Sequence, residues 1–137
     1  MMRDDGSATI EYIGVALAML VPVAYFVVAF TQVQSATYGV VGAAQQGARA
    51  YVQSSSDYLG RFAAARAAAI AGRNHGLIIT SDQVRITCAV ANCLQPGTVV
   101  TIDVRTSIPV PYAPQLGRIP LHSQQVIAVD AYRADPS

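Results

Sequence analysis

Glu11 is the residue whose type and position most clearly suggest chemistry, because it stands where an apolar run begins. Residues 12–30 are almost wholly apolar, and the next charged residue is Arg49. A carboxylate at the edge of a hydrocarbon phase is costly unless it is paired, neutralised or reached by water. Cleavage after Gly6 would create a positively charged α-amine on Ser7, four residues before Glu11, and the two groups could pair between neighbouring subunits. The alternative is that Glu11 simply stays hydrated at a membrane surface.

Cys88 and Cys93 form the second chemical pair of the chain. Their spacing is not C-x-x-C, which argues against a thioredoxin-type redox site, and two cysteines without suitably spaced histidines do not make a zinc site. Because they flank the end of an expected strand, they can form a disulfide if their Cα atoms come within about 7 Å. We predict this disulfide and a head outside the cytoplasm. The alternative is two reduced, buried thiols in a reducing compartment.

The other polar residues form no pattern typical of an enzyme. The chain has no nucleophile elbow, no H-E-x-x-H, no Walker loop and no G-x-G-x-x-G. His75 and His122 are isolated, and we interpret each as a loop or surface residue. We therefore expect no catalytic residue, no metal, no cofactor and no small-molecule substrate. We interpret four dispersed acidic residues as parts of caps, turns and strand faces, namely Asp57, Asp82, Asp103 and Asp130. We interpret three arginines as a solvated face of the second helix, namely Arg61, Arg66 and Arg73. The alternative is that these arginines touch lipid phosphates or partner carboxylates.

The composition excludes two broad classes of protein. Of the 137 residues, 53% are hydrophobic and 12% are charged, whereas a disordered chain has low hydrophobicity and high net charge. The net charge is +1, with nine Arg and no Lys. A nucleic-acid-binding protein is expected to show a basic excess and a basic patch, so we expect no nucleic-acid partner.

The apolar run is long enough to cross a membrane. Its 19 residues would rise roughly 28 Å as a helix, close to the hydrocarbon core of a bilayer at about 30 Å. We predict one membrane span at residues 12–30, and the alternative is a buried core helix of a soluble protein. An ordinary secretory signal does not fit, because the leader, residues 1–6, holds one Arg and two Asp, and no small-residue cleavage site follows the run.

Local patterns predict an α+β fold with a long N-terminal transmembrane helix, a second shorter helix and a small antiparallel sheet of about three strands. The long helix is expected over residues 7–53 and the second helix over residues 57–73, after a serine-rich break that supplies N-cap residues. Residues 54–137 are expected to form one small head. The apolar stripe that we expect to pack the second helix on the sheet consists of Leu59, Phe62, Ala63, Ala67 and Ile70.

Apolar and polar residues alternate in three segments of the head. These segments are residues 84–90, 100–105 and 127–131, and such alternation is typical of half-buried antiparallel strands. Residues 108–120 contain four prolines. Because proline cannot donate to a strand ladder, we expect this stretch to be an extended connection and not a central strand.

Small residues line the second half of the long helix, with Gly39, Gly42 and Gly47 among them. In lipid, where the hydrophobic effect does not drive association, small residues let helix backbones approach closely. We predict that these three glycines serve helix packing. The alternative is that glycine is simply common in membrane helices.

The N-terminal region resembles a known processing site. Gly6 and Ser7, followed by an Ile-Glu-Tyr sequence that contains Glu11 and then by an apolar helix, resemble the class III site of type IV pilins, where a membrane prepilin peptidase cuts after the Gly on the cytoplasmic side. The small-residue segment 43–50 and a final Ile-Ala-Val-Asp-Ala-Tyr strand resemble TadE-like proteins, the pseudopilin or minor-pilin components of Tad (Flp-type) pilus systems. The resemblance is strongest over residues 6–51, and the leader departs from it by being less basic.

This resemblance implies a function in pilus assembly. It implies a minor pilin or pseudopilin of a Tad-type (type IVc) system that carries a prepilin leader, is cut between Gly6 and Ser7, and assembles through its N-terminal helix with Glu11 pairing an amine. The implied partners are other pilin or pseudopilin subunits, the prepilin peptidase, the Tad assembly platform and the cell membrane. The N-terminus would be cytoplasmic and the head extracytoplasmic, with incorporation in a surface pilus. The alternative is a signal-anchored extracytoplasmic binding module that is not processed.

Overall fold

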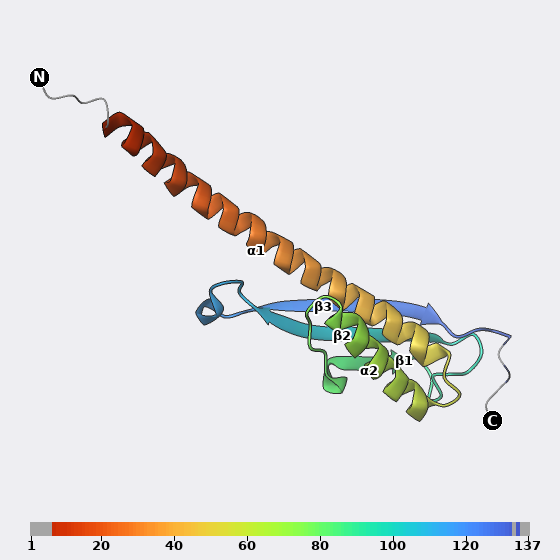
Figure 1. Ribbon diagram of the computed structural model, residues 1–137. Helices are drawn as coiled ribbons and strands as arrows, with labels where there is room; N and C mark the ends of the chain where they lie inside the picture. The colour runs from red at the N-terminus through yellow and green to blue at the C-terminus, as the bar shows by residue number, and fades with distance from the viewer. Residues whose placement is uncertain (1–6, 133, 135–137) are drawn as a thin grey trace, which may run out of the picture.

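The computed structural model describes residues 7–132 and residue 134, which form two helices and a three-stranded sheet (Figure 1). The predicted α+β fold, with a long apolar N-terminal helix and a second shorter one, is confirmed. The elements in chain order are α1 (Ser7–Val52), α2 (Asp57–Arg73), a 3₁₀ turn η1 (Ser81–Gln83), β1 (Val84–Cys88), β2 (Val99–Pro109), a second turn η2 (Pro114–Leu116) and β3 (Arg118–Ala128).

Helix α1 lies in two different environments. It has 46 residues, which corresponds to a length of about 69 Å. Most of its first half projects away from the rest of the chain, and its second half lies on the sheet and beside α2 (Figure 1). The helix runs through Pro22 without a break. Burial begins at Ala36 and recurs at helical spacing, at Ala36, Val40, Ala43, Ala44, Ala48 and Tyr51.

Helix α2 packs against α1 through its smallest residues. It begins after Ser56, whose hydroxyl accepts a hydrogen bond from the Leu59 N–H, as an N-cap residue does. The buried positions of α2 recur every four residues, so that they lie on one face of the helix. They are Gly60, Ala64, Ala68 and Gly72.

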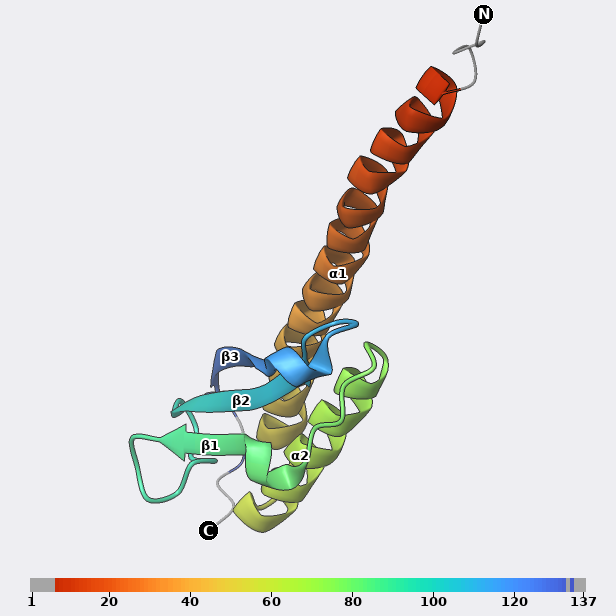
Figure 2. The same ribbon diagram turned by 90° about the vertical axis from the view of Figure 1, so that its left-hand side faces the viewer.

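The prediction that an apolar stripe packs α2 on the sheet is wrong. Its large members, Leu59, Phe62 and Ile70, are 51%, 67% and 48% exposed. The two helices approach so closely that large side chains do not fit between them, since a Cβ on Gly47 would lie 3.3 Å from the backbone oxygen of Ala64. Helix α1 covers β2 and β3, and α2 lies beside it toward β1, as Figure 2 shows.

The sheet has one covered face and one open face. Its strands are antiparallel in the order β1-β2-β3. Val100, Ile102 and Val104 of β2 are buried beneath the helices, whereas Arg105 is exposed on the opposite face. The covered face joins the helices in one core, whose largest fully buried side chains are Tyr51, Leu94, Ile102, Val40, Val100, Val104 and Val129.

The prediction that residues 108–120 form one extended connection is wrong at both ends, because the strands continue into this stretch. Strand β2 continues to Pro109, which pairs with Arg118 at the start of β3. Only residues 110–117 therefore form the loop of this hairpin, which we call the hairpin loop. Pro120 lies inside β3, and proline is tolerated there because β3 is an edge strand.

Candidate membrane and assembly surface

The apolar first half of α1 is bare over most of its length. In the most apolar stretch of 18 residues, none is buried inside the structure. Val21, Phe26 and Phe30, for example, are 63%, 68% and 67% exposed. A core helix of a soluble protein is covered on most sides by its own chain, and this half of α1 is not. The helix is long and apolar enough to be a single membrane span and fits a membrane anchor.

Glu11 lies in this bare segment, one turn after Ser7, the first residue of α1. Its side chain is exposed, and no other residue in the described part of the chain forms an ion pair with it. Gly6 lies outside the described residues. Residues four apart lie on the same side of a helix, so an amine on Ser7 and the Glu11 carboxylate would share one side of α1.

The three glycines predicted to pack helices lie in different surroundings. A Cβ on Gly39 would come within 2.7 Å of the His75 Cβ, and Gly47 packs on Ala64 of α2. These two glycines therefore hold α1 against its own head. Gly42 has nothing within 4 Å of the corresponding position, so it is the glycine of the three that is open to another molecule.

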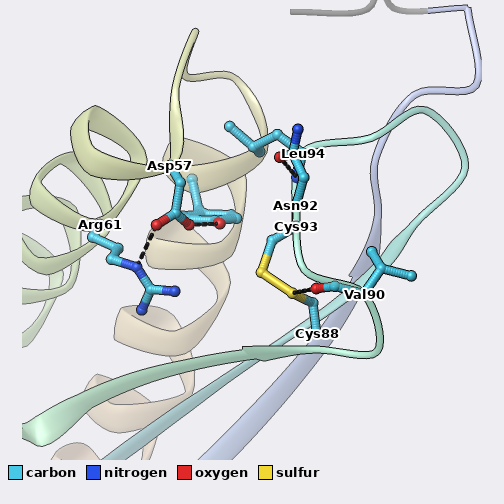
Figure 3. Close-up of a disulfide and its surroundings, with 8 residues drawn as sticks. Asp57, Arg61, Cys88, Val90, Asn92, Cys93 and Leu94 are labelled. Atoms are coloured by element: carbon cyan, nitrogen blue, oxygen red, sulfur yellow. Dashed lines mark hydrogen bonds and ion pairs between the residues drawn. A yellow bond between two sulfur atoms is a disulfide. The ribbon is translucent and has the colours of Figure 1, made fainter. Parts of the chain in front are cut away.

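The predicted disulfide between Cys88 and Cys93 is confirmed, with their Cα atoms 5.5 Å apart (Figure 3). It closes the turn that follows β1. Cys93 is buried, and the next residue, Leu94, is 1% exposed in the core. The bond therefore fixes the position at which this loop enters the core.

Removing the disulfide is expected to destabilise the head moderately. For so short a loop the chain-entropy model gives a loss of about 2 kcal/mol in the free energy of unfolding. We expect this loss for the double variant Cys88→Ala/Cys93→Ala, measured by urea unfolding of the full chain in detergent. A reductant should lower the wild-type value to that of the variant and leave the variant unchanged. Equal stability of oxidised wild type and variant would contradict the prediction.

A buried tyrosine joins the end of α1 to the start of α2. The hydroxyl of Tyr51, a residue with no exposed surface, donates a hydrogen bond to Asp57. Arg61 Nε donates to the other oxygen of the same carboxylate at 2.8 Å (Figure 3). This bond from Arg61 lowers the pKa of Asp57, and burial, together with the Asp57 carboxylate, raises the pKa of Tyr51. The three groups therefore link the end of α1 to the first turn of α2.

Asp103 contacts two basic side chains on the open face of the sheet. His122 Nε2 lies 2.7 Å from one of its oxygens, and Arg105 Nε donates to the other at 2.8 Å. Partial burial alone would raise the pKa of Asp103, but the hydrogen bonds from His122 and Arg105 outweigh it and lower the pKa overall. His122, which the sequence presents as isolated, is therefore part of a cross-strand cluster. In the described chain, no three His, Cys, Asp or Glu side chains could hold a metal ion.

The Asp103 cluster predicts a small loss of stability in acid. Because the folded-state pKa lies below the unfolded value of about 3.9, the stabilisation is present above that value and is lost as the pH falls through the folded-state pKa. We expect Asp103→Asn to flatten the fall in unfolding free energy between about pH 5 and pH 2, by about 1 kcal/mol or less. Thermal unfolding across this range measures the effect. Parallel pH profiles of variant and wild type would contradict it.

No family model, curated protein or solved structure matches this chain. Its function is therefore inferred from its own residues and geometry. Two features remain without a role inside the described structure, namely the bare apolar half of α1 and the exposed carboxylate of Glu11.

Proposed function

We propose that this chain is a minor pilin or pseudopilin of a Tad-type pilus system. In this proposal a prepilin peptidase removes residues 1–6, and the subunit then assembles through α1. The observation that carries the proposal is the bare apolar half of α1, which has its single carboxylate, Glu11, one turn after Ser7. The signature of Gly6, Ser7 and Glu11 supports the same function.

The proposed chemistry is hydrolysis of the peptide bond between Gly6 and Ser7. Water adds across this bond, so that Gly6 leaves with a carboxylate and Ser7 retains an amine. An α-amine has a pKa of about 7.7–8.0, so it is mostly protonated at neutral pH. Charges attract more strongly where water is excluded, and the ammonium group of one subunit would therefore pair with Glu11 of a neighbour inside a bundle of apolar helices.

The bare half of α1 has a use before and after assembly. Before assembly it would keep the subunit in the membrane, with its N-terminus in the cytoplasm and the head outside. After assembly the same surface would be covered by α1 helices of neighbouring subunits. The disulfide between Cys88 and Cys93 supports an extracytoplasmic head, because disulfides persist in oxidising compartments. The prepilin peptidase, other subunits and the assembly platform are the proposed partners.

The intact mass of the protein in its native membrane tests the proposal. We expect a mature chain that begins at Ser7 wherever an active prepilin peptidase is present. A protein that keeps residues 1–6 under those conditions would instead be a signal-anchored module whose head acts outside the cell. Membranes that lack the peptidase provide the control, and there the full chain should persist.

A further inference from the structure

The hairpin loop, residues 110–117, lies against the apolar half of α1. Figure 1 shows the β2–β3 hairpin extending below the projecting half of this helix, at an angle to it, and Figure 2 shows the hairpin loop near the helix from a second direction. The hydroxyl of Tyr25 donates a hydrogen bond to the carbonyl oxygen of Pro111 at 3.0 Å. Gln32 Nε2 donates to the hydroxyl of Tyr112 at 2.9 Å. The loop is thus fixed to α1 by contacts on both sides of the outer end of the apolar run.

The contact with Tyr25 determines the depth of the loop in a membrane. Tyr25 precedes Phe30, the last residue of the apolar run, by five positions, which is about 8 Å along a helix. Interfacial protein segments reach about 5–10 Å into the boundary between headgroups and acyl chains. If α1 spans a bilayer, the hairpin loop therefore lies at this boundary and not in bulk water.

The side chains of the loop suit a lipid interface. No charged residue occurs between Arg105 and Arg118. Tyr112, whose ring lies near that of Tyr25, is 67% exposed, and Leu116 at the tip of the loop is 75% exposed. Tyrosine is enriched where a membrane meets water, because its ring is apolar and its hydroxyl is polar.

The backbone of the loop also suits a medium with little water. Pro111 and Pro114 have no N–H group. The N–H groups of Val110 and Leu116 donate to carbonyl oxygens within the loop, as do those of Ala113 and Gly117. A backbone in contact with lipid must satisfy its own polar groups, because each unsatisfied one costs several kcal/mol. Few backbone N–H groups in this loop therefore depend on solvent for a partner.

We infer that the hairpin loop docks the head on the lipid of the extracytoplasmic leaflet, with Tyr112 and Leu116 inserted beside the span. This inference rests on the proposal that α1 crosses the membrane. The occupant of the surface is lipid, since the loop is continuous with the bare apolar segment and hydrogen-bonded to a residue inside it. The docked loop holds the head close to the bilayer until the subunit leaves the membrane.

The absence of tryptophan from the chain allows a direct test. A single Trp is introduced as Leu116→Trp, an exposed position where a larger ring needs no repacking. The full, uncut chain is placed in phosphatidylcholine nanodiscs, in which both membrane faces are open to solutes. We expect the Trp to lose most of its fluorescence when the lipid carries bromine near the carbonyl end of the acyl chains. We expect aqueous iodide to quench it only weakly.

Two further variants separate failure of this inference from failure of the membrane proposal. Phe26→Trp reports on the span, and bromolipid should quench it strongly. Val126→Trp reports on the open face of the sheet, where Val126 is 55% exposed, and iodide should quench it strongly. If bromolipid quenches Phe26→Trp but not Leu116→Trp, the docking inference alone is overturned. This holds whether iodide then reaches the Trp at position 116 or a second copy of the chain covers it. Absence of quenching at position 26 overturns the membrane span itself.

Discussion

Replacing Gly6 with Leu is expected to abolish removal of residues 1–6 and, with it, incorporation of the chain into a pilus. A peptidase must bring its catalytic groups against the backbone of the residue before the cut, and glycine presents no side chain there. Because Leu adds a branched side chain at this point, the bond to Ser7 stays intact and no amine is made for Glu11. Intact mass in peptidase-containing membranes should show the full chain for the variant and the shortened chain for the wild type.

Gly14→Leu is a matched control for this experiment. It makes the same change in the apolar segment, at a position with nothing within 4 Å of the added Cβ. The Gly14 variant should insert in the membrane and be processed like the wild type. Normal processing of Gly6→Leu would contradict the proposed function.

A Glu11→Gln variant separates cleavage from pairing. Glutamine keeps the shape of the side chain and removes its charge, so we expect normal processing with loss of assembly, scored by recovery of the subunit in sheared pili. An anchored binding module would be indifferent to Gly6→Leu and to Glu11→Gln alike.

The sequence predicts those features that depend on neighbouring residues. The long helix is predicted over residues 7–53 and found over Ser7–Val52, because an unbroken run of apolar and small residues defines it. The second helix is predicted and found at Asp57–Arg73, because Ser56 supplies a local cap. The disulfide follows from two cysteines at the end of one strand. Three antiparallel strands are predicted and found. The bounds of the third are wrong, because it is predicted over residues 127–131 and is found over Arg118–Ala128, so that residues 129–131 follow the strand.

The sequence does not predict which surfaces meet. Leu59 and Phe62 form an apolar stripe, yet the face of α2 that packs is the one bearing Gly60, because close contact with α1 favours small residues over large ones. Gly39 and Gly42 look equivalent in the sequence, but His75 approaches only Gly39, from a turn far away in the chain. Such contacts depend on how distant segments meet, and local periodicity carries no information about that.

Replacing Tyr51 with Ala is expected to cause the largest loss of stability in the head. Tyr51 is among the largest fully buried side chains, and its ring packs so closely on Gly60 that a Cβ there would lie 2.9 Å from Tyr51 Cδ2. Truncating a buried aromatic residue to Ala costs about 3–5 kcal/mol. A typical domain has only about 5–15 kcal/mol in total, so the variant should lose a large share of its stability. Urea unfolding of the full chain in detergent, followed by near-ultraviolet circular dichroism, measures the loss.

Two controls divide this effect into its parts. Tyr51→Phe keeps the ring and removes only the hydrogen bond to Asp57, which Arg61 still partners, so it should cost about 1 kcal/mol. Tyr38→Ala makes the same truncation on α1 at a side chain that is 61% exposed, and it should have little effect. Equal losses for Tyr38→Ala and Tyr51→Ala would contradict the burial of the Tyr51 ring between the helices. The bare half of α1 lies far along the helix from Tyr51. Membrane insertion and cleavage after Gly6 should therefore persist in all three variants. A loss of assembly confined to Tyr51→Ala would then assign a separate role to the folded head.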